Sequence, residues 1–334
     1  MSEDLRAAER ERRRREREER RLKRTGGDEG AVSPPAPPPP PPGPESPTPS
    51  PRRNGRRVGI AVALGMVLLG AAAIAALAYR HFHRSTPPPV VLKTITVTIP
   101  EGYTRAQTSE IAKAEGLRGS YEKASVRSRF LDPASYGGTD AKDLEGFLFP
   151  DTFELEKHAA AADLVQLQLE DFKRRIKGVD MSYARSKNLT TYDVVTIASM
   201  IEREAGLESQ RRLVAAVIYN RLHEGMPLGI DATTRFATGN YTKPLTESEL
   251  AVDSPYNTRT HAGLPPGPID SPGLASIEAA AGPARVDYLY YVVEPGACDK
   301  LAFSSTEAEF EADVARYNSA REAAGGNSPD TCGE

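Results

Sequence analysis

Residues 58–79 form an uncharged apolar run that divides the chain into two parts of different character. At a rise of about 1.5 Å per residue, a helix over this run is long enough to cross a hydrocarbon layer roughly 30 Å thick. The run is too long, and begins too far from the N-terminus, to be a cleaved signal peptide. The sequence therefore predicts a single transmembrane helix over residues 58–79.

The arginines that flank this run predict its orientation. The long Arg-rich N-terminal segment precedes it, together with Arg52, Arg53, Arg56 and Arg57, whereas only Arg80 and Arg84 follow closely. Because positively charged residues are retained on the cytoplasmic side, the N-terminus is expected in the cytoplasm. We therefore expect a single-pass protein of the inner (plasma) membrane whose folded part acts outside the cytoplasm.

Residues 1–57 have a composition that does not support a buried core. Residues 3–24 are almost all Arg, Glu, Ala and Lys, and residues 25–51 are rich in Gly, Pro and Ser. We expect a disordered cytoplasmic arm, with an extended polyproline II spacer over residues 37–42. The interleaved Arg and Glu charges largely cancel, and the charged segment has no aromatic side chain to stack on a base, so no nucleic-acid partner is expected.

The folded part begins with a strand followed by a helix. Residues 90–99 alternate and are β-branched, which predicts a strand that ends at the turn beginning with Pro100. Thr104 and Gln107 have the spacing of a capping box for a short helix. This start is similar to that of a LysM-like glycan-binding module, so residues 88–155 are expected to form a small LysM-like α+β subdomain.

Residues 156–322 are expected to form a second, catalytic α+β domain. It opens with two helical patterns, residues 192–204 and 208–222, and continues with many Gly- and Pro-rich turns of the kind that often line a site. The remaining expectations are a helix over residues 276–281, a hairpin of residues 288–293 and 301–304, a final helix capped by Thr306 and Glu309, and a disordered tail over residues 323–334.

Two carboxylates stand at the end of the first of these helical patterns. Glu202 and Glu204 lie near the C-terminal end of a helix that is apolar on one face, with Thr190 and Asp193 as its capping box. The helix dipole and contact with apolar side chains both raise the pKa of a carboxyl placed there, which suits a general acid. At about 100° per residue the two side chains point roughly 160° apart, so they cannot act as a pair on one substrate atom.

One carboxylate is sufficient for one kind of glycosidic cleavage. A two-carboxylate glycosidase would need a partner, for which Asp231, Asp253 and Asp270 are candidates. A single Glu suffices when the sugar provides the nucleophile: it protonates the glycosidic oxygen and then takes the proton of the sugar's own 6-hydroxyl. This is the lytic transglycosylase reaction. No cofactor is expected, and the scattered histidines lack the spacing of metal ligands.

Six short motifs follow one another in the folded part. They are L-E-G-F-L-F-P-D-T-F at residues 144–153, I-E-R-E at 201–204, V-I-Y-N-R-L at 217–222, Y-N-T at 256–258, G-L-P-P-G-P-I at 263–269 and S-P-G at 271–273. Together with the single membrane helix, they resemble the membrane-bound endolytic murein transglycosylases. The resemblance covers roughly residues 90–321 and implies a LysM-like domain joined to an α+β catalytic domain. The aromatic and branched residues around a Gly and a Pro in the first motif predict that it forms the hinge or strand between the two domains.

The resemblance also implies an activity and a set of site residues. It implies cleavage of the MurNAc–GlcNAc β-1,4 bond of nascent peptidoglycan, with formation of 1,6-anhydro-MurNAc ends and a limit on strand length. The implied partners are peptidoglycan strands, the membrane, and the peptidoglycan synthases or the division and elongation machinery. In that family the second Glu of the E-x-E pair is the acid/base, which is Glu204 here; the residues that would shape the glycan groove are Glu202, Asn220, Asp231, Tyr256 and Asn257.

Some positions depart from the family pattern. Ala205 follows Glu204, where the family favours a hydroxyl residue, and Ala232 follows Asp231, where it favours Pro. Leu301 and Phe310 stand where the family tends to have His, so no role of those histidines carries over to this chain.

Several alternatives remain open from the residues alone. Asn220 lies on an apolar stripe and suits a buried, hydrogen-bonded amide as well as a sugar contact. Tyr256 suits packing as well as stacking on a sugar, and Asn257 suits holding its own turn. The alternative function is an inactive, membrane-tethered peptidoglycan-binding scaffold of the synthesis machinery. Cys298 and Cys332 are able to form one disulfide if the C-terminal half lies outside the cytoplasm.

Overall fold

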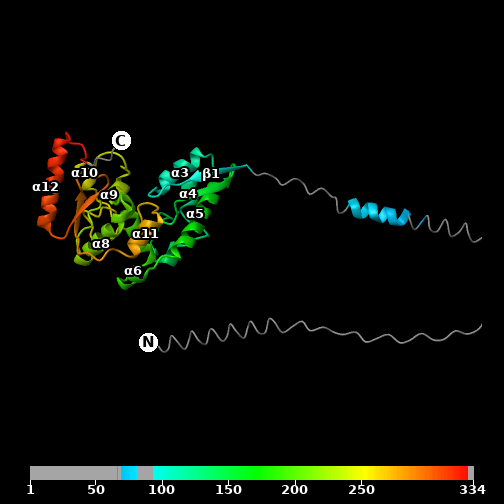
Figure 1. Ribbon diagram of the computed structural model, residues 1–334, viewed down its shortest axis with the longest axis horizontal. Helices are drawn as coiled ribbons and strands as arrows, with labels where there is room; N and C mark the ends of the chain where they lie inside the picture. The colour runs from blue at the N-terminus through cyan, green and yellow to red at the C-terminus, as the bar shows by residue number, and fades with distance from the viewer. Residues whose placement is uncertain (1–65, 67–68, 81–92, 330–334) are drawn as a thin grey trace, which may run out of the picture. The chain divides into compact units, whose positions relative to one another are not determined.

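The structure is a computed structural model that describes residues 66, 69–80 and 93–329 (Figure 1). The chain divides into two units, Met1–Thr86 and Pro87–Glu334. In the first unit residues 69–80 are helical and carry exposed apolar side chains, and no helix among the described residues has the length and apolar character needed to cross a membrane. The expected arm over residues 1–57, and most of the first half of the expected membrane run, lie outside the described residues.

The second unit opens with a two-stranded antiparallel sheet. Strand β1 (Thr94–Thr98) pairs with β2 (Thr152–Glu156), and the chain between them forms α3 (Arg105–Ala114), α4 (Tyr121–Ala124) and the 3-10 helix η1 (Pro133–Tyr136). Thr104 and Gln107 form the predicted capping box of α3. The described part of the predicted strand is confirmed as β1.

The segment that leads into β2 supplies side chains to the core. Leu144, Phe147 and Leu148 are at most 1% exposed. The ring of Phe147 lies 5.0 Å from that of Phe172 on α5 (Ala161–Ile176) and 5.9 Å from that of Tyr192 on α7 (Thr191–Glu204). Of the motif at residues 144–153, only its last two residues belong to strand β2, and its earlier part packs against α5 and α7.

Helix α7 is enclosed by the rest of the second unit. Its residues from Val194 to Ile201 are all buried, and α8 (Glu208–Glu224) and α11 (Leu274–Ala281) pack against it, with α6 (Ser182–Ser186) beside α11. The capping box of Thr190 and Asp193 is present, so the predicted helical pair is confirmed. Because the middle of α7 is fully buried, its C-terminal turn is the part that presents carboxylates near the surface.

Helix α9 (Asp231–Thr238) begins inside residues 225–234, which were expected to form turns, so that expectation was wrong from Asp231 onward. Helix α10 (Glu247–Leu250) lies in residues for which no element was predicted. The N-cap of α9 is Ile230, whose side chain cannot accept a capping hydrogen bond, and the preceding chain is rich in Gly and Pro. Burial of Ala232, Thr233 and Thr234 stabilises α9 instead, and such tertiary burial leaves no local sequence signal.

The C-terminal part follows the predicted order. Strands β3 (Tyr290–Val293) and β4 (Leu301–Ser304) form an antiparallel hairpin. Helix α12 (Glu307–Ala323), drawn in red in Figure 1, follows the hairpin, and the predicted capping box is present at its start. The backbone N–H of Gly296 donates to the carbonyl of Pro329 at 3.0 Å. Cys298 is disulfide-bonded. Cys332 and the end of the expected disordered tail lie outside the described residues.

Candidate active site

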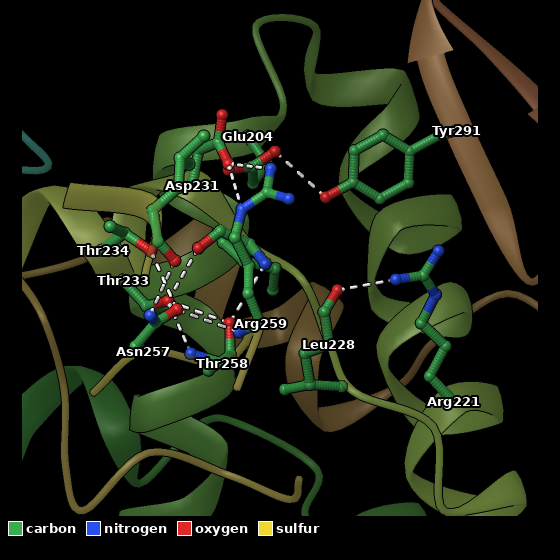
Figure 2. A network of polar contacts seen from close by, with 12 residues as sticks. Glu204, Arg221, Leu228, Asp231, Thr233, Thr234, Asn257, Thr258, Arg259 and Tyr291 are labelled. Atoms are coloured by element: carbon green, nitrogen blue, oxygen red, sulfur yellow. Dashed lines mark hydrogen bonds and ion pairs between the residues drawn. The ribbon is translucent and has the colours of Figure 1, made fainter. Parts of the chain in front are cut away.

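Glu204 is the last residue of α7, and its side chain is half-buried. Its carboxyl oxygen Oε2 accepts a hydrogen bond of 3.0 Å from the phenol of Tyr291 on β3. Figure 2 shows the Tyr291 ring reaching toward Glu204 from the strand. The end of α7 and the hairpin, which are far apart in the sequence, therefore meet at this carboxyl group.

Asp231 and Arg259 lie next to Glu204 (Figure 2). Asp231 is the first residue of α9, and Arg259 Nε donates to its Oδ1 at 3.0 Å. A second guanidinium nitrogen, Nη2, makes an ion pair with the same oxygen. The two side chains are 49% and 41% exposed, respectively, so an accessible pair of opposite charges borders the half-buried Glu204.

The pKa of Glu204 is raised above its ordinary value. Burial is the main cause, and the negative charge of Asp231 adds to it. The hydrogen bond from Tyr291, the backbone N–H of Ala232 and the charge of Arg259 act in the opposite direction. The raised pKa agrees with the prediction for a carboxyl at this helix end. A carboxyl of this kind keeps its proton to higher pH and is able to return to the charged form, as an acid/base group must.

Asn257 and Thr258 hold the start of α9 through hydrogen bonds. Asn257 is fully buried; its Nδ2 donates to the carbonyls of Leu250 and Val252 at 3.0 and 2.9 Å, and its Oδ1 accepts from Thr234. Thr258 Oγ1 accepts from the backbone N–H of Ile230 at 3.0 Å. Since every polar group of Asn257 is used inside the fold, it acts on the site by holding its loop and α9 together.

Asn220 and Arg221 on α8 hold the chain that enters β3. Asn220 Nδ2 donates to the carbonyls of Val286 and Tyr288 at 2.9 and 2.8 Å. Arg221 donates to the carbonyls of Leu289 and Leu228 at 2.6 and 2.7 Å. The amide of Asn220 is hydrogen-bonded, as one of the two alternatives expected, but it is only partly buried, and a contact with a sugar stays a prediction.

Comparison with known proteins gives the family. The YceG-like family matches residues 71–316, which is more than half of the chain. The chain belongs to the YceG-like family. Relatives named endolytic murein transglycosylase, from Streptococcus pneumoniae (strain ATCC BAA-255 / R6) and Bacillus subtilis (strain 168), are each 31% identical to it, over 249 and 243 residues.

The matched part differs in extent between these relatives. It covers 66% of this chain and 44% of the pneumococcal protein, and 68% of this chain and 64% of the Bacillus protein. The chain thus spans about half to two thirds of the length of the curated relatives. The crystal structure of a YceG-like protein from Listeria monocytogenes is 30% identical, with a TM-score of 0.58, and the match covers 65% of this chain and 75% of that one.

Glu202 of this family member lies on the other side of α7 from Glu204. Its carboxylate pairs with Arg211 of α8 at 3.1 Å and accepts the backbone N–H of Gly273, the N-cap of α11, at 3.0 Å. Its side chain is only 7% exposed. Glu202 therefore ties α8 and α11 to α7, and the prediction that the two carboxylates cannot act as a pair is confirmed.

Tyr256 packs against the far part of α9. Its ring lies 4.9 Å from that of Phe236, and burial raises its pKa to about 12. The side chain is half-buried, so packing is observed and stacking on a sugar stays a prediction. Of the three loop aspartates considered as partners, Asp231 is the one beside Glu204; Asp253 is fully exposed and Asp270 is 1% exposed.

Tyr291 and Arg259 were missed by the sequence reasoning. Alternation along a strand places Tyr290 and Tyr291 on opposite faces, but it does not tell which face meets α7. Arg259 directly follows the Y-N-T motif, yet its pairing with Asp231 depends on how two loops fold together. Among the described residues, no group of His, Cys, Asp and Glu is arranged to hold a metal ion.

Proposed function

We propose that this chain is a lytic transglycosylase that cuts peptidoglycan strands internally, at the MurNAc–GlcNAc β-1,4 bond. The observation that carries the proposal is a half-buried glutamate of raised pKa, hydrogen-bonded to the phenol of Tyr291 and bordered by an accessible ion pair. The names of the relatives from Streptococcus pneumoniae and Bacillus subtilis support it.

Glu204 performs both proton transfers of this reaction. In the first, the protonated carboxyl gives its proton to the glycosidic oxygen, the bond between that oxygen and C1 breaks, and the GlcNAc residue leaves with a free hydroxyl. In the second, the 6-hydroxyl oxygen of MurNAc bonds to C1, and its proton passes to the Glu204 carboxylate. The product has a 1,6-anhydro end, no water is consumed, and Glu204 is protonated again.

Asp231 and Arg259 act on the charge that develops between these two steps. As the glycosidic bond breaks, positive charge builds up at C1 and its ring oxygen, and a nearby carboxylate stabilises that charge. The ion pair with Arg259 fixes the orientation of Asp231 and limits how far its charge raises the pKa of Glu204. Asn257 shapes the groove by holding the start of α9, and Asn220 by holding β3; Glu202 and Tyr256 shape it through packing.

The anchor and the first subdomain belong to the same proposal. Exposed Leu69, Ile74 and Leu77 in the helical residues 69–80 support a membrane anchor over residues 58–79, with the arm in the cytoplasm and the site outside. The antiparallel pairing of β1 and β2 around α3 and α4 supports a LysM-like subdomain over residues 88–155. A cytoplasmic reporter fused near residue 30 should be active, and an inactive one would contradict this orientation.

Such an anchored enzyme would work on strands as they are made. The proposed partners are peptidoglycan strands and, through the cytoplasmic arm or the membrane, the synthases or the division and elongation machinery. Internal cleavage close to the membrane would limit the length of the strands.

Replacement of Glu204 by Gln tests the reaction. Because the amide cannot donate a proton as the carboxyl does, release of anhydro-muropeptides from purified glycan strands should fall by about 10³-fold. Glu208→Gln, at an exposed position that begins α8, is the matched control and should retain its activity.

The two alternative outcomes have different meanings. Full activity of Glu204→Gln would show that another group is the acid. A wild-type protein that binds the strands but releases no anhydro product would favour the inactive scaffold instead.

A further inference from the structure

The hydrogen bond between Tyr291 and Glu204 is made by a strand whose position is fixed on several sides. Tyr290, the neighbouring residue on β3, faces the other way and stacks on Phe310 of α12, with ring centroids 4.9 Å apart. The guanidinium of Arg221 lies 5.3 Å from the centre of the same ring. These contacts leave β3 little freedom to move away from Glu204.

The ring of Tyr291 is also held from its own face of the hairpin. Tyr291 lies opposite Phe303 in the β3–β4 register, and their ring centroids are 6.0 Å apart. The carbonyls of Tyr288 and Leu289, just before the strand, accept hydrogen bonds from Asn220 and Arg221. The phenol is therefore presented to Glu204 by a hairpin that α8 and α12 both hold.

The hydrogen bond distinguishes the two oxygens of the Glu204 carboxyl. Oε2 accepts from the Tyr291 hydroxyl at 3.0 Å, and the backbone N–H of Ala232 is a second donor beside the carboxyl. A carboxyl group whose one oxygen is held by a fixed phenol has its other oxygen restricted in direction. Proton transfer depends steeply on such alignment of the donor with the reacting atom.

We propose that Tyr291 is a positioning residue for Glu204: its hydroxyl holds Oε2 and so aims Oε1 first at the glycosidic oxygen and then at the 6-hydroxyl of the sugar. This rests on the proposed transglycosylase function. Tyr291 itself exchanges no proton with the substrate, and all protons balance between Glu204, the glycosidic oxygen and the 6-hydroxyl.

The same hydrogen bond also changes the pKa of Glu204. Burial raises the pKa of Glu204, and the phenol, which donates to the charged form, lowers it. Removing the phenol therefore raises the pKa further. A purely structural tyrosine would have no such effect on Glu204.

Replacement of Tyr291 by Phe in the full chain tests the proposal, because it removes the hydroxyl and keeps the ring. We expect kcat for anhydro-muropeptide release to fall roughly 10- to 100-fold, since the carboxyl loses its alignment, with little change in KM. The alkaline limb of the pH profile of kcat/KM should move to higher pH. Tyr290→Phe is the matched control, because it loses a hydroxyl on the opposite face of the same strand and should keep both the rate and the pH profile.

The results separate this proposal from the proposed function. If the wild type is active, Glu204→Gln is inactive and Tyr291→Phe keeps the wild-type rate and pH profile, Tyr291 is not a positioning residue. A loss of rate in Tyr291→Phe with an unmoved pH profile would assign Tyr291 a structural role only. If the wild type forms no anhydro product, the proposed function itself fails; NMR titration of labelled glutamate carboxyls would then still test whether Tyr291→Phe raises the pKa of Glu204.

Discussion

Glu204 and Asp270 are two carboxyl groups with raised pKa values in contrasting surroundings. Glu204 is half-buried at the end of α7 and accepts a hydrogen bond from Tyr291. Asp270 follows Ile269, whose N–H donates to Ser199 of α7, and it is 1% exposed. Neither of its carboxyl oxygens has a hydrogen-bond partner among the described residues, and its pKa is raised well above the ordinary value, mainly by burial.

The contrast shows that a raised pKa does not by itself identify a catalytic acid. Glu145 makes the same point: it is 8% exposed, and burial raises its pKa to about 8 while it accepts the backbone N–H of Arg105. Asp270 and Glu145 lack a path to a polymeric substrate. Glu204 combines the raised pKa with exposure, a side-chain donor that orients it, and an accessible ion pair beside it. These additional features make it the candidate acid.

The largest effect on stability is expected for replacement of Asp270. Burial raises the pKa of Asp270 in the folded state, so above the ordinary range of Asp the folded chain holds a proton that the unfolded chain releases, and its stability falls as pH rises. Asp270→Asn is neutral at every pH and nearly the same shape. We expect it to raise the free energy of unfolding at pH 7 by about 1–3 kcal/mol, and by less toward pH 4.

Thermal unfolding of the two proteins across this pH range checks the expectation. Activity per folded molecule should be unchanged in Asp270→Asn, whereas Glu204→Gln should lose its activity. If Asp270→Asn were less stable than the wild type at every pH, the carboxylate would have a stabilising partner. The contrast between an unpartnered Asp270 and a hydrogen-bonded Glu204 would then be wrong.

A smaller effect, on the pH profile of activity, is expected when Asp231 beside Glu204 is replaced. The charge of Asp231 raises the pKa of Glu204, so Asp231→Asn should lower it and move the alkaline limb of kcat/KM to lower pH, by less than about one unit. This is opposite in sign to the shift expected for Tyr291→Phe. Asp253→Asn, at a fully exposed site, serves as the control. If Asp231→Asn and Tyr291→Phe moved the alkaline limb in the same direction, the electrostatic account would be contradicted.

Much of the fold was predictable because its signals are local. The capping boxes at Thr104, Thr190 and Thr306 marked three helix starts, and the β-branched and aromatic residues of the β3–β4 hairpin marked its strands. Helix α9 was missed because its N-cap is Ile230 and its stability comes from tertiary burial.

The site was predictable in part for the same reason. Helical geometry alone separated Glu202 from Glu204, because their angular spacing is a local property. The contact of Glu204 with Tyr291 joins residues far apart in the sequence, and the pairing of Asp231 with Arg259 depends on how two loops meet. The resemblance to the family, rather than any pattern in the helix, selected Glu204 from the two carboxylates.

The central claim is that Glu204 performs both proton transfers and that the sugar's own 6-hydroxyl replaces water as the nucleophile. Digestion of purified glycan strands in water enriched in oxygen-18, followed by mass spectrometry of the fragments, measures this directly. We predict anhydro ends that carry no oxygen-18 and are one water lighter than hydrolysed ends, and we predict their loss in Glu204→Gln. Reducing ends that contain oxygen-18 would show that water is the nucleophile and would contradict the account.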